Sequence, residues 1–224
     1  MTEALWTAVD NYIHDALVPS DTALDAAIEA SNAAGLPPIQ VTPSQGKFLH
    51  LLAKIQGARR ILEIGTLGGY STIWLARALP EGGRIVTIEA DPRHADIARK
   101  NISRAGLDPL VDLRLGRALD VLPELASEGN GAFDFTFIDA DKQHIPEYFE
   151  FALKLSRRGS VILVDNVVRD GRIVDTKSRD PDIMGIRRFN EILAAEPRVS
   201  ATAIQTVGAK GYDGFAIVLV TEDI

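Results

Sequence analysis

Oxygen-bearing side chains follow two apolar segments in the second half of the chain. Asp139 comes directly after a segment that ends at Ile138, and Asp165 and Asn166 follow one that ends at Val164. If these segments are neighbouring parallel strands, the three side chains converge at the carboxyl edge of one sheet, where ligands bind. Such an oxygen set selects a hard cation, so we expect Mg²⁺, or alternatively Mn²⁺ or Ca²⁺, rather than zinc.

This predicted metal site suits a substrate with two adjacent hydroxyl groups. Both oxygens could chelate the cation, which would lower the pKa of a hydroxyl and fix its angle for transfer chemistry. Lys142 lies close to Asp139 in the sequence and could accept or steer the hydroxyl proton, since a lysine near a cation can have a lowered pKa. Lys142 and Asp139 are therefore the candidate catalytic residues. The plainer alternative is a surface lysine beside solvated strand-end loops.

A glycine-rich segment, residues 65–69, follows the first predicted strand. Glycines at a strand-to-helix turn let the backbone approach a ligand closely, and a helix N-terminus offers free amide donors. The dinucleotide fingerprint would require glycine at Leu67 and Tyr70, and the lysine of a phosphate-binding P-loop is absent. The segment is therefore not a recognisable pyrophosphate site.

Two carboxylates accompany this glycine segment. Glu63, near the end of the first predicted strand, would repel a pyrophosphate but suits a cationic or hydroxyl-rich ligand. Glu89 ends the second predicted strand, about where acidic residues bind ribose hydroxyls in nucleotide folds. S-adenosylmethionine carries a sulfonium, an ammonium and two ribose hydroxyls. Each feature alone is generic, but their order predicts this cofactor.

Alternating strand and helix patterns position these residues. Apolar runs predict strands at 60–64, 84–89, 111–115, 133–138 and 160–164, separated by helical patterns at 70–79, 93–105, 119–128 and 148–155. This alternation is typical of a doubly wound α/β fold with a buried parallel sheet. Three helical patterns precede it, at 2–17, at 21–34 and from residue 43 onwards.

The C-terminal part departs from a dinucleotide-binding domain. After a helix near 183–195, two strand patterns at 199–207 and 214–221 have a connection too short for a crossover helix, so we expect an antiparallel pair. We predict a single domain over 1–224, in which helices within 1–56 cap the site and 57–224 form a Rossmann-like core.

Composition excludes several classes of protein. The 224 residues carry a net charge of −7, which disfavours a general nucleic-acid binder. The absence of cysteine excludes disulfides and thiolate chemistry. No apolar run could cross a bilayer and no signal peptide is evident, so a cytoplasmic location is expected. Residues 157–188 hold eight Lys or Arg against five Asp or Glu, which indicates a solvated surface or a patch for an anionic substrate.

The motifs together resemble those of the cation-dependent class I O-methyltransferases, which include caffeoyl-CoA O-methyltransferases and bacterial relatives, with catechol O-methyltransferase as a more distant cousin. The resemblance runs from about Thr42 to the C-terminus. It implies a Rossmann-like methyltransferase fold, with a seven-stranded sheet whose last strand is antiparallel and with extra N-terminal helices. It also implies a homodimer. The motifs that carry it are Thr42-Pro-Ser-Gln-Gly46, Glu63-Ile-Gly-Thr66, Gly69-Tyr-Ser71, Gly116-Arg-Ala-Leu119, Asp139-Ala-Asp-Lys142 and Val164-Asp-Asn166.

The resemblance implies a role for each site residue. Glu89 would hold the ribose, Ala118 would lie by the adenine, and Lys142 would be the base. Metal ligands would be Asp139, Asp165 and Asn166. The S-adenosylmethionine site would comprise Val41, Glu63, Gly65, Thr66, Ser71, Glu89, Ala118, Asp141 and Tyr148.

Two segments depart from the family's pattern. His144 and Ile145 replace the usual Asn and Tyr, and His144 is either a second proton acceptor or an ordinary loop residue. Residues 168–184 are rich in Arg and Asp but lack aromatic side chains, which argues against a plant-type CoA ester. An aromatic substrate would have to stack on Trp6, Tyr12 or Tyr212 instead.

We therefore expect an S-adenosylmethionine- and metal-dependent O-methyltransferase that acts on a small phenolic, catechol-type substrate. Direct in-line methyl transfer would draw most of its rate from positioning and electrostatics. Two alternatives stay open. The first is a tRNA hydroxyuridine O-methyltransferase whose basic residues within 157–188 contact phosphates, and the second is a non-catalytic S-adenosylmethionine-binding protein.

Overall fold

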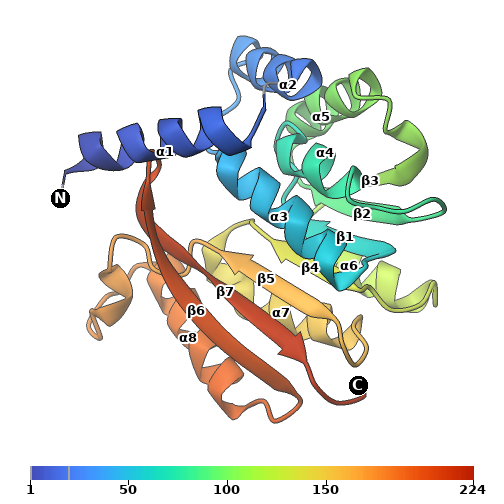
Figure 1. Ribbon diagram of the computed structural model, residues 1–224. Helices are drawn as coiled ribbons and strands as arrows, with labels where there is room; N and C mark the ends of the chain where they lie inside the picture. The colour runs from blue at the N-terminus through green and yellow to red at the C-terminus, as the bar shows by residue number, and fades with distance from the viewer. Residues whose placement is uncertain (1, 20) are drawn as a thin grey trace.

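A seven-stranded sheet forms the centre of the computed structural model, which describes residues 2–19 and 21–224 (Figure 1). Met1 and Ser20, which belong to the predicted domain, lie outside the described residues. The strand order is β3-β2-β1-β4-β5-β7-β6. The strands are β1 Arg60–Ile64, β2 Arg84–Glu89, β3 Val111–Leu115, β4 Phe135–Ile138, β5 Val161–Asp165, β6 Val199–Gly208 and β7 Gly211–Val220.

The direction of the last strand confirms the predicted topology. Strands β1 to β5 pair in parallel, whereas β7 runs antiparallel to both of its neighbours, β5 and β6. Only Ala209 and Lys210 separate β6 from β7, so the two strands form a tight hairpin. The predicted fold class, a Rossmann-like methyltransferase fold with extra N-terminal helices, is correct.

Helices cover both faces of this sheet, as a doubly wound fold requires. Because side chains alternate along each strand, Ile61 packs with α3, α4 and α5 on one face, and Leu62 packs with α6, α7 and α8 on the other. The helices are α1 Glu3–Leu17, α2 Thr22–Ala33, α3 Pro43–Gln56, α4 Tyr70–Ala76, α5 Pro92–Arg104, α6 Ala118–Ser127, α7 Ile145–Lys154 and α8 Pro181–Ala195, with short 3-10 turns η1 Asp108–Leu110, η2 Lys142–His144 and η3 Arg172–Val174. No helix among the described residues has the length and apolarity to cross a membrane.

Helices α2, α3, α5 and α8 begin close to the positions predicted from the sequence, because a capping residue marks the start of each. The side chains of Asp21, Thr42, Asp91 and Asp180 each accept a hydrogen bond from a first-turn amide of α2, α3, α5 and α8. Proline occupies the first position of α3, α5 and α8, where its fixed backbone angle suits the helix and its missing N–H costs nothing.

Several element boundaries differ from the predicted ones. α4 ends at Ala76 rather than near 79, because the next turn closes through tighter bonds from Ala78 to Leu75 and from Leu79 to Ala76. α7 begins at 145 and β7 at 211, both three residues earlier than predicted. β4 begins at 135, two residues later than predicted, and the Asp134 side chain before it accepts the amide hydrogens of residues 59 and 60.

The hairpin turn between β6 and β7 joins the C-terminal end of the fold to its N-terminal helices. The amide of Ala209 donates to Asp10 Oδ2 at 2.7 Å, and Lys210 Nζ donates to the Pro38 carbonyl at 2.6 Å. Figure 1 shows the turn lying against α1. The segment between α2 and α3 is thereby held beside the carboxyl edge of the sheet.

A close helix contact fixes the backbone of η2, which carries Lys142. Gly185 of α8 is buried, and a Cβ atom there would overlap the Lys142 carbonyl oxygen and approach Gln143 Cα to 2.7 Å. Both neighbours are backbone atoms, which cannot move aside as a flexible side chain would. Glycine at 185 therefore allows α8 to support η2 directly.

We predict that Gly185→Ala lowers the free energy of unfolding by about 1–3 kcal/mol, because overpacking must displace η2. Met184→Ala on the exposed side of the same helix is the matched control and should stay within about 0.5 kcal/mol of the wild type. Urea denaturation measures both. Equal stability of the two variants would contradict the proposed close contact.

Candidate active site

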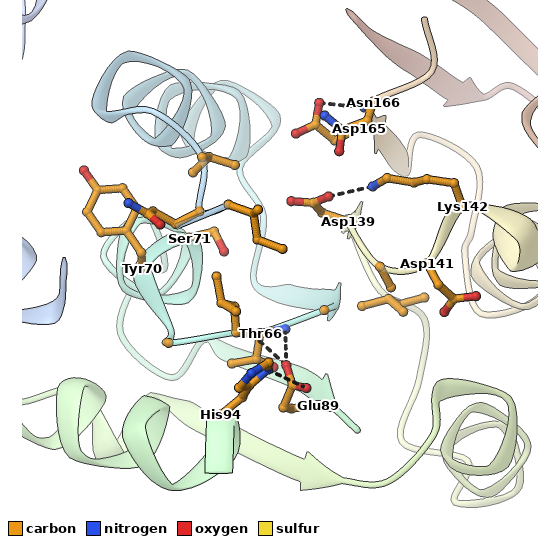
Figure 2. A pocket seen from close by; sticks show the side chains of 18 of the residues that line it. Thr66, Tyr70, Ser71, Glu89, His94, Asp139, Asp141, Lys142, Asp165 and Asn166 are labelled. Carbon is orange, nitrogen blue, oxygen red and sulfur yellow. Dashed lines mark hydrogen bonds and ion pairs between the residues drawn. The ribbon is translucent and has the colours of Figure 1, made fainter. Parts of the chain in front are cut away.

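A cleft of about 670 Å³ opens at the carboxyl ends of the parallel strands (Figure 2). Its walls come from the glycine segment after β1, the ends of β2, β4 and β5, and the residues between α2 and α3. Twelve of the thirteen predicted site residues line it: Val41, Gly65, Thr66, Ser71, Glu89, Ala118, Asp139, Asp141, Lys142, Tyr148, Asp165 and Asn166. Glu63 does not.

The predicted metal ligands lie together because β4 and β5 are neighbours. Ile138 pairs with Val164 in parallel register, so the residues that follow, Asp139 and Asp165, emerge at the same edge. Figure 2 shows both carboxylates and Asn166 on one side of the cleft. Asn166 adopts a left-handed conformation with φ of 58°, and its backbone amide donates to Asp165 Oδ1 at 2.9 Å.

Negative charge at this corner of the cleft is poorly compensated. Burial and the neighbouring charge of Asp139 together raise the pKa of Asp165 to about 7, against the opposing effect of Lys142. Lys142 Nζ donates to Asp139 Oδ1 at 2.7 Å, and Gln45 Nε2 donates to Asp165 Oδ2 at 2.6 Å. Two close carboxylates share one ammonium group, so a further cation would be stabilised here.

The donor set fits a hard divalent cation. Two carboxylates and an amide oxygen are the ligands that such an ion prefers, and they leave positions for water or substrate oxygens. Within residues 2–19 and 21–224, no three His, Cys, Asp or Glu side chains gather in a metal-binding arrangement. The third protein ligand would therefore be the side-chain amide oxygen of Asn166.

The Glu89 carboxylate organises the glycine segment. Its Oε2 accepts the amides of Thr66 and Leu67 at 3.2 and 2.7 Å, and its Oε1 accepts the Asp91 amide at 2.9 Å. His94 Nδ1 lies 3.5 Å from Oε1. Glu89 is thus held at the cleft wall by backbone donors, where its remaining lone pairs can accept further hydroxyl groups.

Gly65 is required by a close backbone approach. Its φ is 100°, and a Cβ atom would overlap the Asp139 carbonyl oxygen and lie 2.8 Å from the carbonyl carbon. The glycine segment and the segment after β4 are therefore in contact through their backbones. The predicted cofactor and metal positions share this wall.

Glu63 lies beneath the glycine segment rather than in the cleft. Its carboxylate is fully buried and accepts hydrogen bonds from the hydroxyls of Ser71, Thr72 and Thr87 at 2.6, 2.5 and 2.6 Å. Burial raises the pKa of Glu63 to about 7, although these hydroxyls oppose the shift. Of its three partners, only Ser71 lines the cleft, so Ser71 is the link between Glu63 and the cleft.

Asp141 accepts two side-chain hydrogen bonds at the opposite wall. The Tyr148 hydroxyl donates to Oδ1 at 2.5 Å, and His144 Nδ1 contacts Oδ2. Burial would raise the pKa of Asp141, but these two partners hold it below its usual value. Burial, together with Asp141, raises the pKa of Tyr148, so the phenol stays a donor. Asp141 therefore offers a charged, oriented acceptor to a cationic group.

Several cleft residues were not predicted as ligands. Gln45 belongs to a motif of the family resemblance, but only the fold shows that it reaches Asp165. His94 carries no signal in the sequence beyond its position near Glu89. Of the three aromatic residues considered for ring stacking, Tyr212 lines the cleft and Trp6 and Tyr12 do not. Other unpredicted lining residues are Ile28, Ser31, Ile39, Asp170, Asp182 and Lys210.

The fold and cleft define a Rossmann-like methyltransferase. A model of the O-methyltransferase family matches residues 18–219, so the chain belongs to this family of S-adenosylmethionine-dependent enzymes. Catechol O-methyltransferase of Niastella koreensis is 53% identical over 220 residues, which are 98% of this chain and 100% of that protein. Catechol O-methyltransferase of Mycobacterium tuberculosis is also 53% identical, over 95% of this chain and 94% of the relative.

Solved structures are equally similar. An O-methyltransferase from Bacillus cereus in complex with SAH is 60% identical, with a TM-score of 0.97 over 98% of this chain and 100% of that one. TomG of Streptomyces achromogenes, in complex with SAM and involved in tomaymycin synthesis, is 52% identical, with a TM-score of 0.96 over 99% of both chains.

Glu63 predicts a pH-dependent stability. Because its folded pKa lies near 7 and its unfolded pKa near 4.5, its favourable contribution is complete below pH 4.5 and is lost as pH rises through 7. The free energy of unfolding of the wild type should fall by about 3 kcal/mol relative to Glu63→Gln across this window, without cofactor. Urea denaturation at a series of pH values measures the difference, and a difference independent of pH would refute the assignment.

Proposed function

We propose that this chain transfers the methyl group of S-adenosylmethionine to one hydroxyl of a small catechol-type aromatic substrate, with a divalent cation. The observation that carries the proposal is the grouping of Asp139, Asp165 and Lys142 at one end of a cleft whose other end is the glycine segment. The names of the two relatives at 53% identity support the catechol class.

The proposed cofactor site follows the wall from the glycine segment to α7. Glu89 would accept the ribose hydroxyls, Ala118 would lie by the adenine, and Asp141 would accept the ammonium group. The remaining contacts would come from Val41, Gly65, Thr66, Ser71 and Tyr148, with Glu63 acting behind Ser71. The solved relatives in complex with SAH or SAM support the choice of cofactor.

The proposed metal ligands are Asp139, Asp165 and Asn166. A divalent cation held there would chelate adjacent substrate oxygens and make a hydroxyl easier to ionise. The Gln45 side chain and the backbone amide of Asn166 each donate to the Asp165 carboxylate, so they fix its orientation toward the cleft. The choice among Mg²⁺, Mn²⁺ and Ca²⁺ rests on which ion supports turnover.

Lys142 is the proposed proton acceptor. In the structure its ammonium donates to Asp139, and it must release a proton before it can accept one from substrate. The reaction then forms an O–CH₃ bond and breaks the S–CH₃ bond, and the hydroxyl proton passes to Nζ. No covalent enzyme intermediate is needed.

We predict that Lys142→Met lowers kcat on catechol about 10²- to 10⁴-fold, since the proton acceptor is removed. Affinity for S-adenosylmethionine, measured by calorimetry, should be nearly unchanged. Lys177→Met, an exposed lysine outside the cleft, is the matched control. A loss confined to cofactor affinity would contradict a role in proton transfer.

The central experiment is transfer of a labelled methyl group from S-adenosylmethionine to catechol, with added Mg²⁺ and with EDTA. Asp165→Asn, and EDTA with the wild type, should each reduce the rate at least about 100-fold because the cation is lost. Asp108→Asn, an exposed carboxylate of η1, should keep wild-type activity. Undiminished turnover in EDTA would remove the metal from the mechanism, and no turnover under any condition would refute the substrate class.

The ion pairs within residues 157–188 argue against the tRNA alternative. Within the basic stretch, Arg157, Arg169, Arg172 and Arg188 pair with carboxylates of the same chain, so their charge is not free for phosphates. A tRNA lacking this methylation belongs in the same assay. Salt-sensitive methylation of tRNA without catechol turnover would establish that alternative, and cofactor binding without transfer to either acceptor would establish a non-catalytic role.

The homodimer, the cytoplasmic location and the division at residue 56 remain predictions.

A further inference from the structure

A second cavity, of about 310 Å³, lies at the amino ends of the strands, away from the cleft. Arg60 and Arg84, the first residues of β1 and β2, line it together with Phe133 and the C-terminal end of α6. The proposed methyl-transfer site lies at the carboxyl ends of the same strands. The second cavity therefore has no part in the reaction described above.

Two arginines in this cavity lie side by side. Arg60 pairs with Arg84 in parallel register, so both side chains leave the same face of the sheet. Among the described residues, no carboxylate lies within ion-pair distance of either guanidinium, and Arg60 Nε is buried without a hydrogen-bond partner. Two adjacent like charges without a counter-ion are destabilising, which an anion would relieve.

The carboxylates that line this cavity are already engaged. Arg114 Nε donates to both oxygens of Asp112 at 2.9 and 2.8 Å, and its terminal nitrogens donate to Glu128 at 2.9 and 3.3 Å. Three arginines and two carboxylates leave one net positive charge in the lining. That excess resides on Arg60 and Arg84.

Arg60 is also held in place before any ligand arrives. Its guanidinium carbon lies 5.1 Å from the centre of the Phe133 ring, and that ring is buried. A stacked guanidinium has lost much of its rotational freedom, so little further entropy is lost when it binds. Its planar fork can then donate two parallel hydrogen bonds to one oxyanion.

We propose that this cavity binds a small phosphate-bearing molecule, with the Arg60 and Arg84 guanidinium groups on its phosphate oxygens. A phosphate group offers enough acceptor oxygens for both guanidinium groups and supplies the negative charge that the lining lacks. The cavity volume exceeds the needs of the phosphate group alone and leaves space for an attached organic part. The site is independent of the proposed catechol chemistry.

The test is calorimetric titration of inorganic phosphate into the full-length protein, at ionic strength matched with sodium chloride. Saturable binding should weaken about tenfold or more in Arg60→Gln and in Arg84→Gln, because each loses a charged fork. Arg99→Gln is the matched control, because this exposed arginine of α5 lies outside the cavity, and it should bind as the wild type does. Affinity for S-adenosylhomocysteine should be the same in all four proteins.

Three results would overturn the proposal. One is the absence of saturable phosphate binding by the wild type, and another is equal affinity in the wild type and both glutamine variants. Displacement of phosphate by S-adenosylhomocysteine would also place the anion in the catalytic cleft instead. Arg84 is exposed at the start of its strand, so Arg84→Gln tests the site even if replacement of Arg60 disturbs the fold.

Discussion

The parallel register of β4 and β5 is the constraint that brings Asp139 and Asp165 together at one corner of the cleft. It brings two carboxylates, Asp139 and Asp165, to one edge of the sheet, where burial and the charge of Asp139 oppose the ionisation of Asp165. The surrounding elements each place a donor against this pair: η2 supplies Lys142, α3 supplies Gln45, and the segment after β5 supplies the Asn166 amide. The fold thus gathers two carboxylates around a single ammonium group, an arrangement that favours the divalent cation proposed above.

The glycine segment and the segment after β4, which form neighbouring parts of the cleft wall, are in direct backbone contact. Gly65 brings the glycine segment into backbone contact with Asp139, so a shift of either segment must be transmitted to the other. Glu89 holds the glycine segment through two of its backbone amides, and Glu63 holds Ser71 at the start of the helix that follows. The distance between a methyl donor and an oxygen acceptor would therefore be set mainly by backbone, which suits a reaction whose rate depends on alignment.

Local patterns were sufficient to predict the sheet and the acidic edge. Strand alternation, capping residues and the shared carboxyl edge of parallel strands are local or topological signals, and they correctly located the strands and the grouping of Asp139 with Asp165. The contacts of Gln45 and Lys210 were not predictable because they join segments 120 and 172 residues apart. Glu63 was expected in the cleft, but three hydroxyls hold its side chain beneath the glycine segment, which no spacing rule indicates.

The hairpin contact with Asp10 and Pro38 bears on how the protein matures during synthesis. β7 lies between β5 and β6, so β6 has no neighbour in the sheet until the last strand is available. A ribosome-bound chain can assemble β1 to β5 early, yet α1 and the segment before α3 lack these two contacts until residues 209 and 210 emerge and β7 is in place. The cleft wall between α2 and α3 would thus gain its last support only when translation is nearly complete.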